Sequence, residues 1–238
     1  MIFHTLENDR EFENERFTVQ VANPPYSTKW SADPKFMEDE RYSPYGKLAP
    51  SSKADFAFVQ HMIHHMDEGD SRIAVLLPHG VLFRGAAEEI IRKYIIKDLN
   101  YLDAVIGLPA NCFQGTSIPV CCLVFKKERN GNSDNIFFVD ASKEFVPGKA
   151  MNYITDEHID KIVGAYMERE DIDKYCHKAY MNEIEKNDYN LNIPRYVDTF
   201  EEEEPVDIVA NKKKLAELEA KEKAALDKVN AFLAELGL

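Results

Sequence analysis

Short apolar runs alternate with helical patterns over the first 140 residues, and this order limits the chain to few folds. Phe17–Ala22 is a candidate strand, and Asp55–Met66 has apolar side chains at helical spacing, with Asp55 placed to cap the helix. Such alternation is typical of parallel α/β architecture with helices packed on the sheet. The loop at 109–118 has no helix, so the strands beside it could pair antiparallel. The other predicted elements are a helix at Ala86–Leu99 and strands at Arg72–Leu77, Leu102–Leu108, Pro119–Lys126 and Ile136–Val139.

The pattern changes after about residue 141, where strand-like runs give way to helical ones. Residues 155–168 and 171–186 have the spacing of apolar side chains that is expected of helices. We therefore predict an α/β part at 1–150, a helical extension at 151–200 and a separate long helix at 201–238.

A long helix is predicted from about Val206 to Leu236, after the charged sequence "EEEEP". One helix of this length cannot bury its apolar stripe alone. It either packs back on its own domain or forms a coiled-coil arm for a partner subunit. The apolar seam repeats every seven residues and consists of Ile208, Leu215, Leu218, Ala225, Val229, Phe232 and Leu236.

Glycine is scarce where a nucleotide-binding sheet normally needs it. A doubly wound sheet usually has a Gly-rich turn after its first strand, where backbone amides meet the ligand. Residues 1–16 contain no glycine, and "PHGVLFRG" at 78–85 lacks the GxGxxG spacing. Either the fold needs no such turn, or the chain lacks the half that carries it.

Composition excludes several classes of function. The formal net charge of −13 argues against tight nucleic-acid binding by this chain alone, because phosphate contacts need lysine and arginine. The sequence has no signal peptide and no run of about 18 apolar residues, which predicts a soluble, intracellular protein without membrane contact. The four cysteines and the histidines at 61, 64 and 65 form no supported metal-binding pattern, so we predict no metal site.

The sequence Asn23-Pro24-Pro25-Tyr26 directly follows the first predicted strand. Neither proline can donate to a strand ladder, and each restricts the residue before it, so the segment is stiff. An exocyclic amine on an aromatic ring is a poor nucleophile because its lone pair is delocalised. The Asn23 side-chain oxygen and the Pro24 carbonyl could accept its hydrogens, and a flipped base could stack on Tyr26. The alternative is a proline-rich turn in which Asn23 caps a neighbouring backbone group.

Five segments, in this order, resemble the modification subunit of type I restriction–modification systems. They are "VANPPYSTKW", "SSKADFAFVQHMIHHM", "RIAVLLPHGVLFRG", "IRKYIIKDLNYLDAVIGLPANCFQGTSIPVCCLVFKK" and "NDYNLNIPRYVD". The resemblance implies an S-adenosylmethionine-dependent DNA adenine-N6 methyltransferase that acts on double-stranded DNA. It also implies a specificity subunit bound through the C-terminal helix, a restriction subunit in the full complex and a cytoplasmic location.

The resemblance assigns roles to individual residues. It implies that Asn23 and Pro24 hold the target amine and that Tyr26 stacks on the flipped adenine. Phe113, in the loop "NCFQGTSIP", would close on the base from another side, although a core aromatic is the alternative. Asn23 and Phe56 are candidate contacts to S-adenosylmethionine. The residues expected to be catalytic are Asn23, Pro24, Pro25 and Tyr26.

The chain departs from the family pattern before the tetrapeptide, where a helical domain, a Gly-rich cofactor turn and an acidic residue for the ribose are expected. We therefore predict a partial Rossmann-like methyltransferase sheet at 1–150 that lacks its first strands, and we expect little activity from this chain alone. Two alternatives remain. The same tetrapeptide serves methyltransferases of RNA adenine or protein glutamine, and the chain could be a non-enzymatic scaffold that pairs with a specificity subunit.

Overall fold

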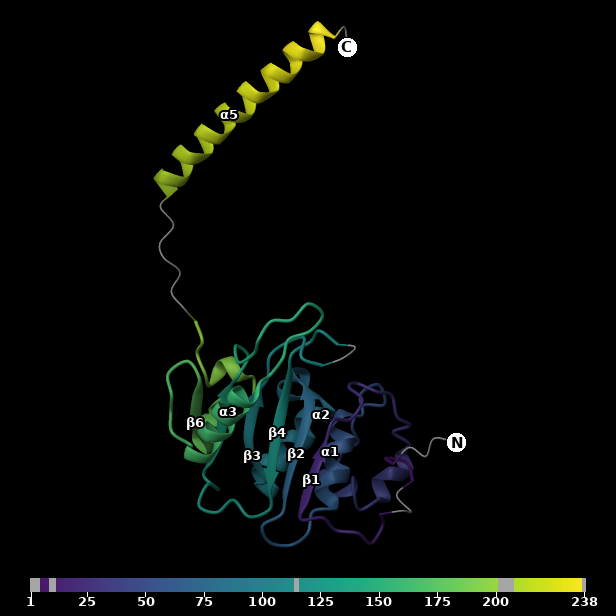
Figure 1. The fold of residues 1–238 in the computed structure, drawn as a ribbon. Coiled ribbons are helices and arrows are strands. Elements are labelled where there is room, and N and C mark those ends of the chain that lie inside the picture. Colours follow the sequence, from purple (N-terminus) through teal and green to yellow (C-terminus); the bar gives the residue numbers. More distant parts are fainter. Residues whose placement is uncertain (1–4, 9–11, 114–115, 201–207, 237–238) are drawn as a thin grey trace. The chain divides into compact units, whose positions relative to one another are not determined.

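A computed structural model describes residues 5–8, 12–113, 116–200 and 208–236 of the chain. Its internal contacts separate two compact units, Met1–Thr199 and Phe200–Leu238. The first unit is an α/β structure, and the described part of the second is mainly one helix (Figure 1).

The first unit is built on a six-stranded mixed sheet in the order β1-β2-β4-β3-β5-β6 (Figure 1). β1 is parallel to β2 and β3 is parallel to β5, whereas β4 is antiparallel to both β2 and β3. β1, β2, β3 and β5 therefore run in one direction, and their carboxyl ends lie at one edge of the sheet. This confirms the α/β class and the antiparallel pairing across the loop at 109–118. The strands are β1 Val19–Ala22, β2 Arg72–Pro78, β3 Leu102–Gly107, β4 Val120–Lys126, β5 Asn135–Asp140 and β6 Cys176–Tyr180.

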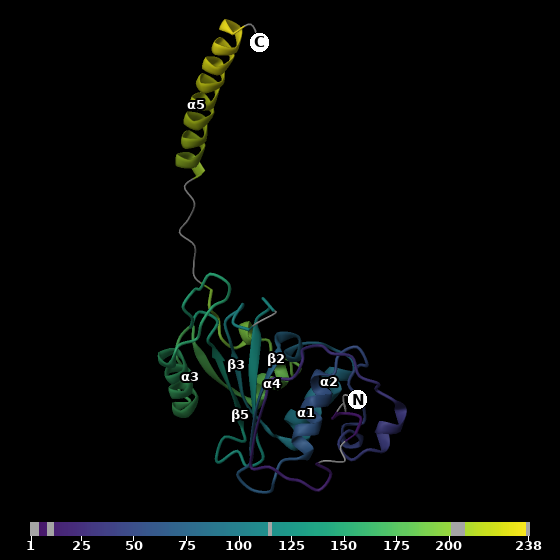
Figure 2. The same cartoon turned by 45° about the vertical axis from the view of Figure 1, so that its right-hand side comes forward.

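Helices cover both faces of the sheet (Figure 2). One hydrophobic cluster joins the sheet to α1, α2 and α4 through Phe56, Ile91 and Ile184, and a second joins it to α3 through Ile162 and Ala165. The predicted helix at 86–99 is α-helical only in its first half, and Tyr94–Leu99 continues as a π-helix. The α-helices are α1 Asp55–His64, α2 Ala87–Lys93, α3 Asp156–Glu168, α4 Met181–Lys186 and α5 Ile208–Glu235.

The helix predicted at 171–186 is wrong in its first half. Arg169 ends α3 in a left-handed conformation, with φ 52°, and Lys174 has φ 58°. The chain then forms β6, which pairs antiparallel with β5, and only afterwards enters α4. The unpaired backbone groups of β5 are satisfied in this way, and that gain outweighs the local helical pattern. Residues from the predicted helical extension therefore contribute a strand to the sheet.

A β-bulge interrupts β3 at Asp103. Leu102 pairs with Phe125 and Ala104 pairs with Val124, so Asp103 is an extra residue in the ladder. Its carboxylate is fully buried and accepts a hydrogen bond from the Tyr166 hydroxyl of α3 at 2.6 Å. Burial alone would raise the pKa of Asp103, but the Tyr166 hydrogen bond and nearby arginines outweigh it and lower the pKa. The bulge thus fastens α3 to the sheet.

The second unit contains α5, which confirms the predicted long helix over Ile208–Glu235. The "EEEEP" sequence lies outside the described residues. Side chains of the predicted apolar seam, such as Leu215 and Val229, are more than half exposed. Among the described residues, α5 and the shorter helices all lack the length or the apolarity needed to cross a membrane.

Candidate active site at the carboxyl end of β1

The Asn-Pro-Pro-Tyr segment begins where β1 ends. Ala22 is the last residue of β1 and pairs with Val75 of β2. The ladder ends there because neither following proline has an N–H to donate. The segment therefore lies at the sheet edge where the four parallel strands present their carboxyl ends, the usual position of ligand sites in such sheets.

Asn23 and Tyr26 lie together. The Tyr26 hydroxyl donates a hydrogen bond to the side-chain oxygen of Asn23 at 2.7 Å. Asn23 is exposed, Pro24 is buried, and the Tyr26 ring is partly buried. Burial, and to a smaller degree Cys121, raises the pKa of Tyr26, so its hydroxyl stays protonated near neutral pH and remains a donor. Asn23 is thus an exposed residue whose side-chain oxygen is bound to a partly buried tyrosine.

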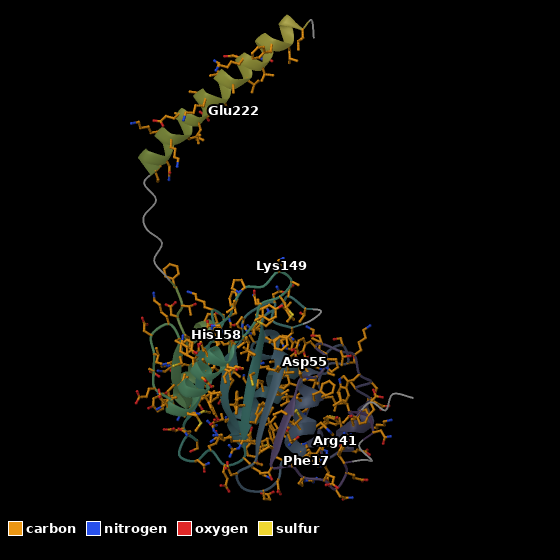
Figure 3. The ribbon with its side chains drawn as sticks, in the orientation of Figure 1. Phe17, Arg41, Asp55, Lys149, His158 and Glu222 are labelled. Carbon is orange, nitrogen blue, oxygen red and sulfur yellow. The ribbon has the colours of Figure 1, made fainter. Side chains whose placement is uncertain are left out.

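Asp55 holds the other end of this segment. Its carboxylate accepts a hydrogen bond from the Ser27 backbone N–H at 2.7 Å, and Ser27 directly follows Tyr26. The sequence predicted Asp55 as a helix cap, but α1 has Ala54 at its N-cap position without a side-chain cap. The second carboxylate oxygen of Asp55 accepts from Arg84 at 3.0 Å, after the end of β2. Asp55 (labelled in Figure 3) therefore links α1 to the turn after Tyr26 and to the segment after β2.

The loop at 27–52 uses its aromatic side chains for packing. Trp30 is buried and stacks on Phe36, with ring centroids 5.6 Å apart and planes at 23°. The Trp30 indole N–H donates to the Pro50 carbonyl, which closes the loop on itself. Arg41 is held by Asp39 at 2.7 Å. These contacts pack the loop on itself in one ordered arrangement.

Phe113 lies in the loop between β3 and β4. Its side chain is partly buried, and it forms an isolated β-bridge with Thr116. The loop is braced by Asn152, whose backbone N–H donates to the Asn111 carbonyl at 2.8 Å. The Asn152 side chain also donates to the Ala110 carbonyl at 2.9 Å. Within the described ranges, no hydrogen bond or ring contact joins Phe113 to Tyr26, so its approach to a base remains a prediction.

Phe56, the other candidate cofactor contact, is a core residue. Its side chain is 2% exposed and belongs to the hydrophobic cluster between α1 and the sheet. Packing explains this position fully, and contact with a cofactor stays a prediction. The residues missed from sequence are Ser27 and Arg84, because only their spatial arrangement around Asp55 reveals them.

The chain matches the protein family described as N-6 DNA Methylase over residues 1–205. It is 36% identical over 222 residues to the type I restriction enzyme MpnII methylase subunit of Mycoplasma pneumoniae, covering 92% of this chain and 40% of that protein. The MjaVII methylase subunit of Methanocaldococcus jannaschii is 35% identical over 227 residues, covering 90% of this chain and 38% of that protein. The chain thus spans about two fifths of the length of these curated relatives.

A solved structure has a closely similar fold. The type I restriction-modification system methyltransferase subunit from Streptococcus thermophilus has a TM-score of 0.78 and 54% sequence identity to this chain. The likeness covers 82% of this chain and 41% of that one. These matches confirm the resemblance that the five sequence segments predicted.

Proposed function

Because the chain belongs to the N-6 DNA methylase family, we propose that it forms the target-base part of a DNA adenine-N6 methyltransferase, the modification subunit of a type I restriction–modification system. The observation that supports this most directly is the exposed residue Asn23 at the end of β1, whose side-chain oxygen is held beside Tyr26 by a 2.7 Å hydrogen bond. This arrangement offers one acceptor and one stacking face to a single planar base.

The chemistry follows from the acceptors. The target amine is a poor nucleophile because its lone pair is delocalised into the base. Asn23 and the Pro24 carbonyl accept the two amine hydrogens, which favours tetrahedral nitrogen and the positive charge that develops during attack. Tyr26 stacks on the flipped adenine. A carboxamide oxygen has two lone pairs, so Asn23 can accept from the base while Tyr26 still donates to it.

S-adenosylmethionine supplies the electrophilic methyl group when bound. Asn23 is exposed at the end of β1, and β1 is an edge strand that pairs on one side only within the described residues. An exposed asparagine at this edge of the sheet fits a residue that contacts the cofactor. The chain's own contribution is limited, because its sequence has no GxGxxG turn.

The net charge of the chain and the exposed apolar seam of α5 both indicate that it works with other subunits. A net charge of −13 means that basic groups on other chains supply much of the grip on double-stranded DNA. We assign residues 1–150 to the catalytic part, 151–200 to an extension of it, and 201–238 to contact with a specificity subunit. A restriction subunit would join this pair in the full complex, and the cytoplasm is the compartment of such a system.

The test is methyl transfer to duplex DNA by the complete enzyme, with this chain joined to the remaining sequence of a full-length methylase subunit and combined with a specificity subunit. Asn23→Ala should lower the rate by about 10²-fold or more, the usual effect of losing one preorganised partner. Asn182→Ala, on the exposed surface of α4, is the matched control. A folded Asn23→Ala enzyme with the wild-type rate would refute the proposal, and a wild-type complex without methyl transfer would favour a scaffold.

A further inference from the structure

We propose that Asp55 is a positioning residue that sets the place of Tyr26 and Asn23 through the backbone of Ser27. The inference rests on the proposed function for its effect on methylation, but its structural part can be tested without activity. Asp55 is 1% exposed. A carboxylate that is so deeply buried needs partners on both oxygens, and the partners found here come from the loop after β1 and from the segment after β2.

Both oxygens of Asp55 accept hydrogen bonds. Oδ1 accepts the Ser27 N–H at 2.7 Å, and Oδ2 accepts from Arg84 at 3.0 Å and from the Ser27 hydroxyl at 3.5 Å. Ser27 has φ 47°, a left-handed conformation that costs energy for a residue with a side chain. The hydrogen bond to Asp55 offsets that cost and selects this backbone conformation. The turn immediately after Tyr26 is therefore imposed by a group from α1.

The Arg84 guanidinium lies against Gly80, where the absence of a side chain leaves space for it. A Cβ atom added to Gly80 would clash with the Arg84 guanidinium, so an alanine there would displace the guanidinium from this place. Arg84 also donates to the buried Glu88 at 2.8 Å, four residues along the chain. Burial, with a smaller contribution from Asp55, raises the pKa of Glu88 against the opposing charge of Arg84. Arg84 thus bridges two buried carboxylic groups through one nitrogen and holds Asp55 in position for Ser27.

The chain of contacts ends at the proposed catalytic oxygen. Asp55 fixes Ser27, Ser27 is bonded to Tyr26, and the Tyr26 hydroxyl holds Asn23 at 2.7 Å. A change at Asp55 therefore shifts both the stacking face and the acceptor. A displacement of about 1 Å in such a group can cost on the order of 10²-fold in rate.

Asp103 is a matched control for burial and charge. It is fully buried, and its carboxylate is paired with Arg129 at 2.9 Å and Arg169 at 3.0 Å. Its side-chain contacts go to β4, to the segment after β4 and to the end of α3, and none of those described involves residues 23–27. Asp103→Asn should therefore destabilise the fold at least as much as Asp55→Asn does, but leave the segment after β1 in place.

The first measurement is ¹⁹F NMR of the 238-residue chain labelled with 3-fluorotyrosine. The Tyr26 resonance is assigned by its loss in Tyr26→Phe. Asp55→Asn should broaden or shift this resonance, and Gly80→Ala should do the same to a smaller extent because it moves Arg84. Asp103→Asn should leave it unchanged. An unchanged Tyr26 resonance in folded Asp55→Asn and Gly80→Ala chains would overturn the proposal.

The second measurement is the methylation rate of the complete enzyme. Asp55→Asn should lower kcat by about 10-fold or more, with the KM for S-adenosylmethionine nearly unchanged, whereas Asp103→Asn should keep kcat within about 2-fold. Equal losses of kcat in both variants would reduce Asp55 to a general stabilising residue and overturn the proposal. If Asn23→Ala is fully active, the proposed function fails, and the Tyr26 resonance alone still decides the role of Asp55.

Discussion

The Tyr26 hydroxyl lies 2.7 Å from the side-chain oxygen of Asn23 and donates a hydrogen bond to it. The two residues are separated by the rigid Pro24-Pro25 pair, so the contact closes a small ring at the end of β1. It also means that the proposed acceptor for a target amine already has one donor before any base arrives.

Removal of this donor separates the roles of the Tyr26 hydroxyl and ring. In the complete enzyme, Tyr26→Phe should lower methylation by about 3-fold to 10-fold, because the ring can still stack but Asn23 loses the donor that holds its side chain. Tyr26→Ala should lose about 10-fold to 100-fold in kcat/KM, since base–aromatic stacking contributes about 1–3 kcal/mol. Rates measured over a range of DNA concentrations test both effects. Comparable losses in the two variants would show that the hydroxyl, and not the ring, is essential.

The pH dependence of stability should report on His177. Burial lowers the pKa of His177, but hydrogen bonds and charges from Glu183 and Asp171, each 3.0 Å away, outweigh it and raise the pKa above the ordinary value of 6.5. A raised pKa in the folded state means that the stabilisation is fully present below about pH 6.5. It is lost as the pH rises through the pKa of the folded protein.

Denaturant unfolding of wild-type and His177→Gln chains at several pH values measures this contribution. The difference in unfolding free energy between them should be largest near pH 5.5 and should shrink as the pH rises above 7. Other titrating groups cancel in the difference. A difference that is constant with pH would contradict a raised pKa for His177.

The same substitution, glycine to alanine, should change the free energy of unfolding in opposite directions at two positions. A Cβ atom at Gly107, the last residue of β3, would lie 2.6 Å from the Cδ1 atom of buried Ile193. Gly107→Ala should therefore destabilise the fold by about 1–3 kcal/mol through overpacking. Gly164 lies within α3 with no atom within 4 Å of an added Cβ, so Gly164→Ala should stabilise by about 0.5–1 kcal/mol. Urea unfolding measures both values, and a stabilising Gly107→Ala would disprove the close contact.

The apolar seam of α5 should be required for assembly. Leu218 and Val229 are 54% and 55% exposed, respectively, and lie on the predicted coiled-coil face. The double substitution Leu218→Glu with Val229→Glu should abolish co-purification with the specificity subunit, because it places two charges in an apolar contact. The melting temperature of the first unit should barely change.

The control for this pair changes the same charge on the other side of the helix. Ala220→Glu with Ala224→Glu adds two glutamates outside the heptad seam and should leave co-purification intact. A helix that packs on its own domain predicts a different result, in which the seam variant lowers the melting temperature. Retained co-purification of the seam variant would remove the coiled-coil assignment.

The sequence predicted five of the six strands because they are short apolar runs bounded by turns. β2, for example, alternates buried and less buried residues from Arg72 to Pro78. β6 could not be predicted in this way, because "CHKAY" is half polar and lies in a helical context. It becomes a strand through pairing with β5, a long-range interaction that local spacing does not record.

The residues of the proposed site also fall into those that the sequence could indicate and those that only the structure reveals. Asn23 and Tyr26 could be selected from sequence because a double proline after a strand is rare and stiff. The link between Asp55, Ser27 and Arg84 joins residues that are 28 and 29 positions apart, so no local pattern shows it. Phe56 lies in the core at the start of α1, and its contact with a cofactor stays a prediction.

The bulge in β3 has a consequence for how this strand can vary between relatives. Leu102 and Ala104 belong to the clusters on opposite faces of the sheet, with Asp103 inserted between them. Deletion of Asp103 would leave an uninterrupted strand in which every other side chain keeps its face. Deletion of any residue further along β3 would turn the remaining side chains inside out. Position 103 is therefore where an alignment of this strand can accept a one-residue gap. Such a gap would remove the hydrogen bond between the Asp103 carboxylate and Tyr166 of α3.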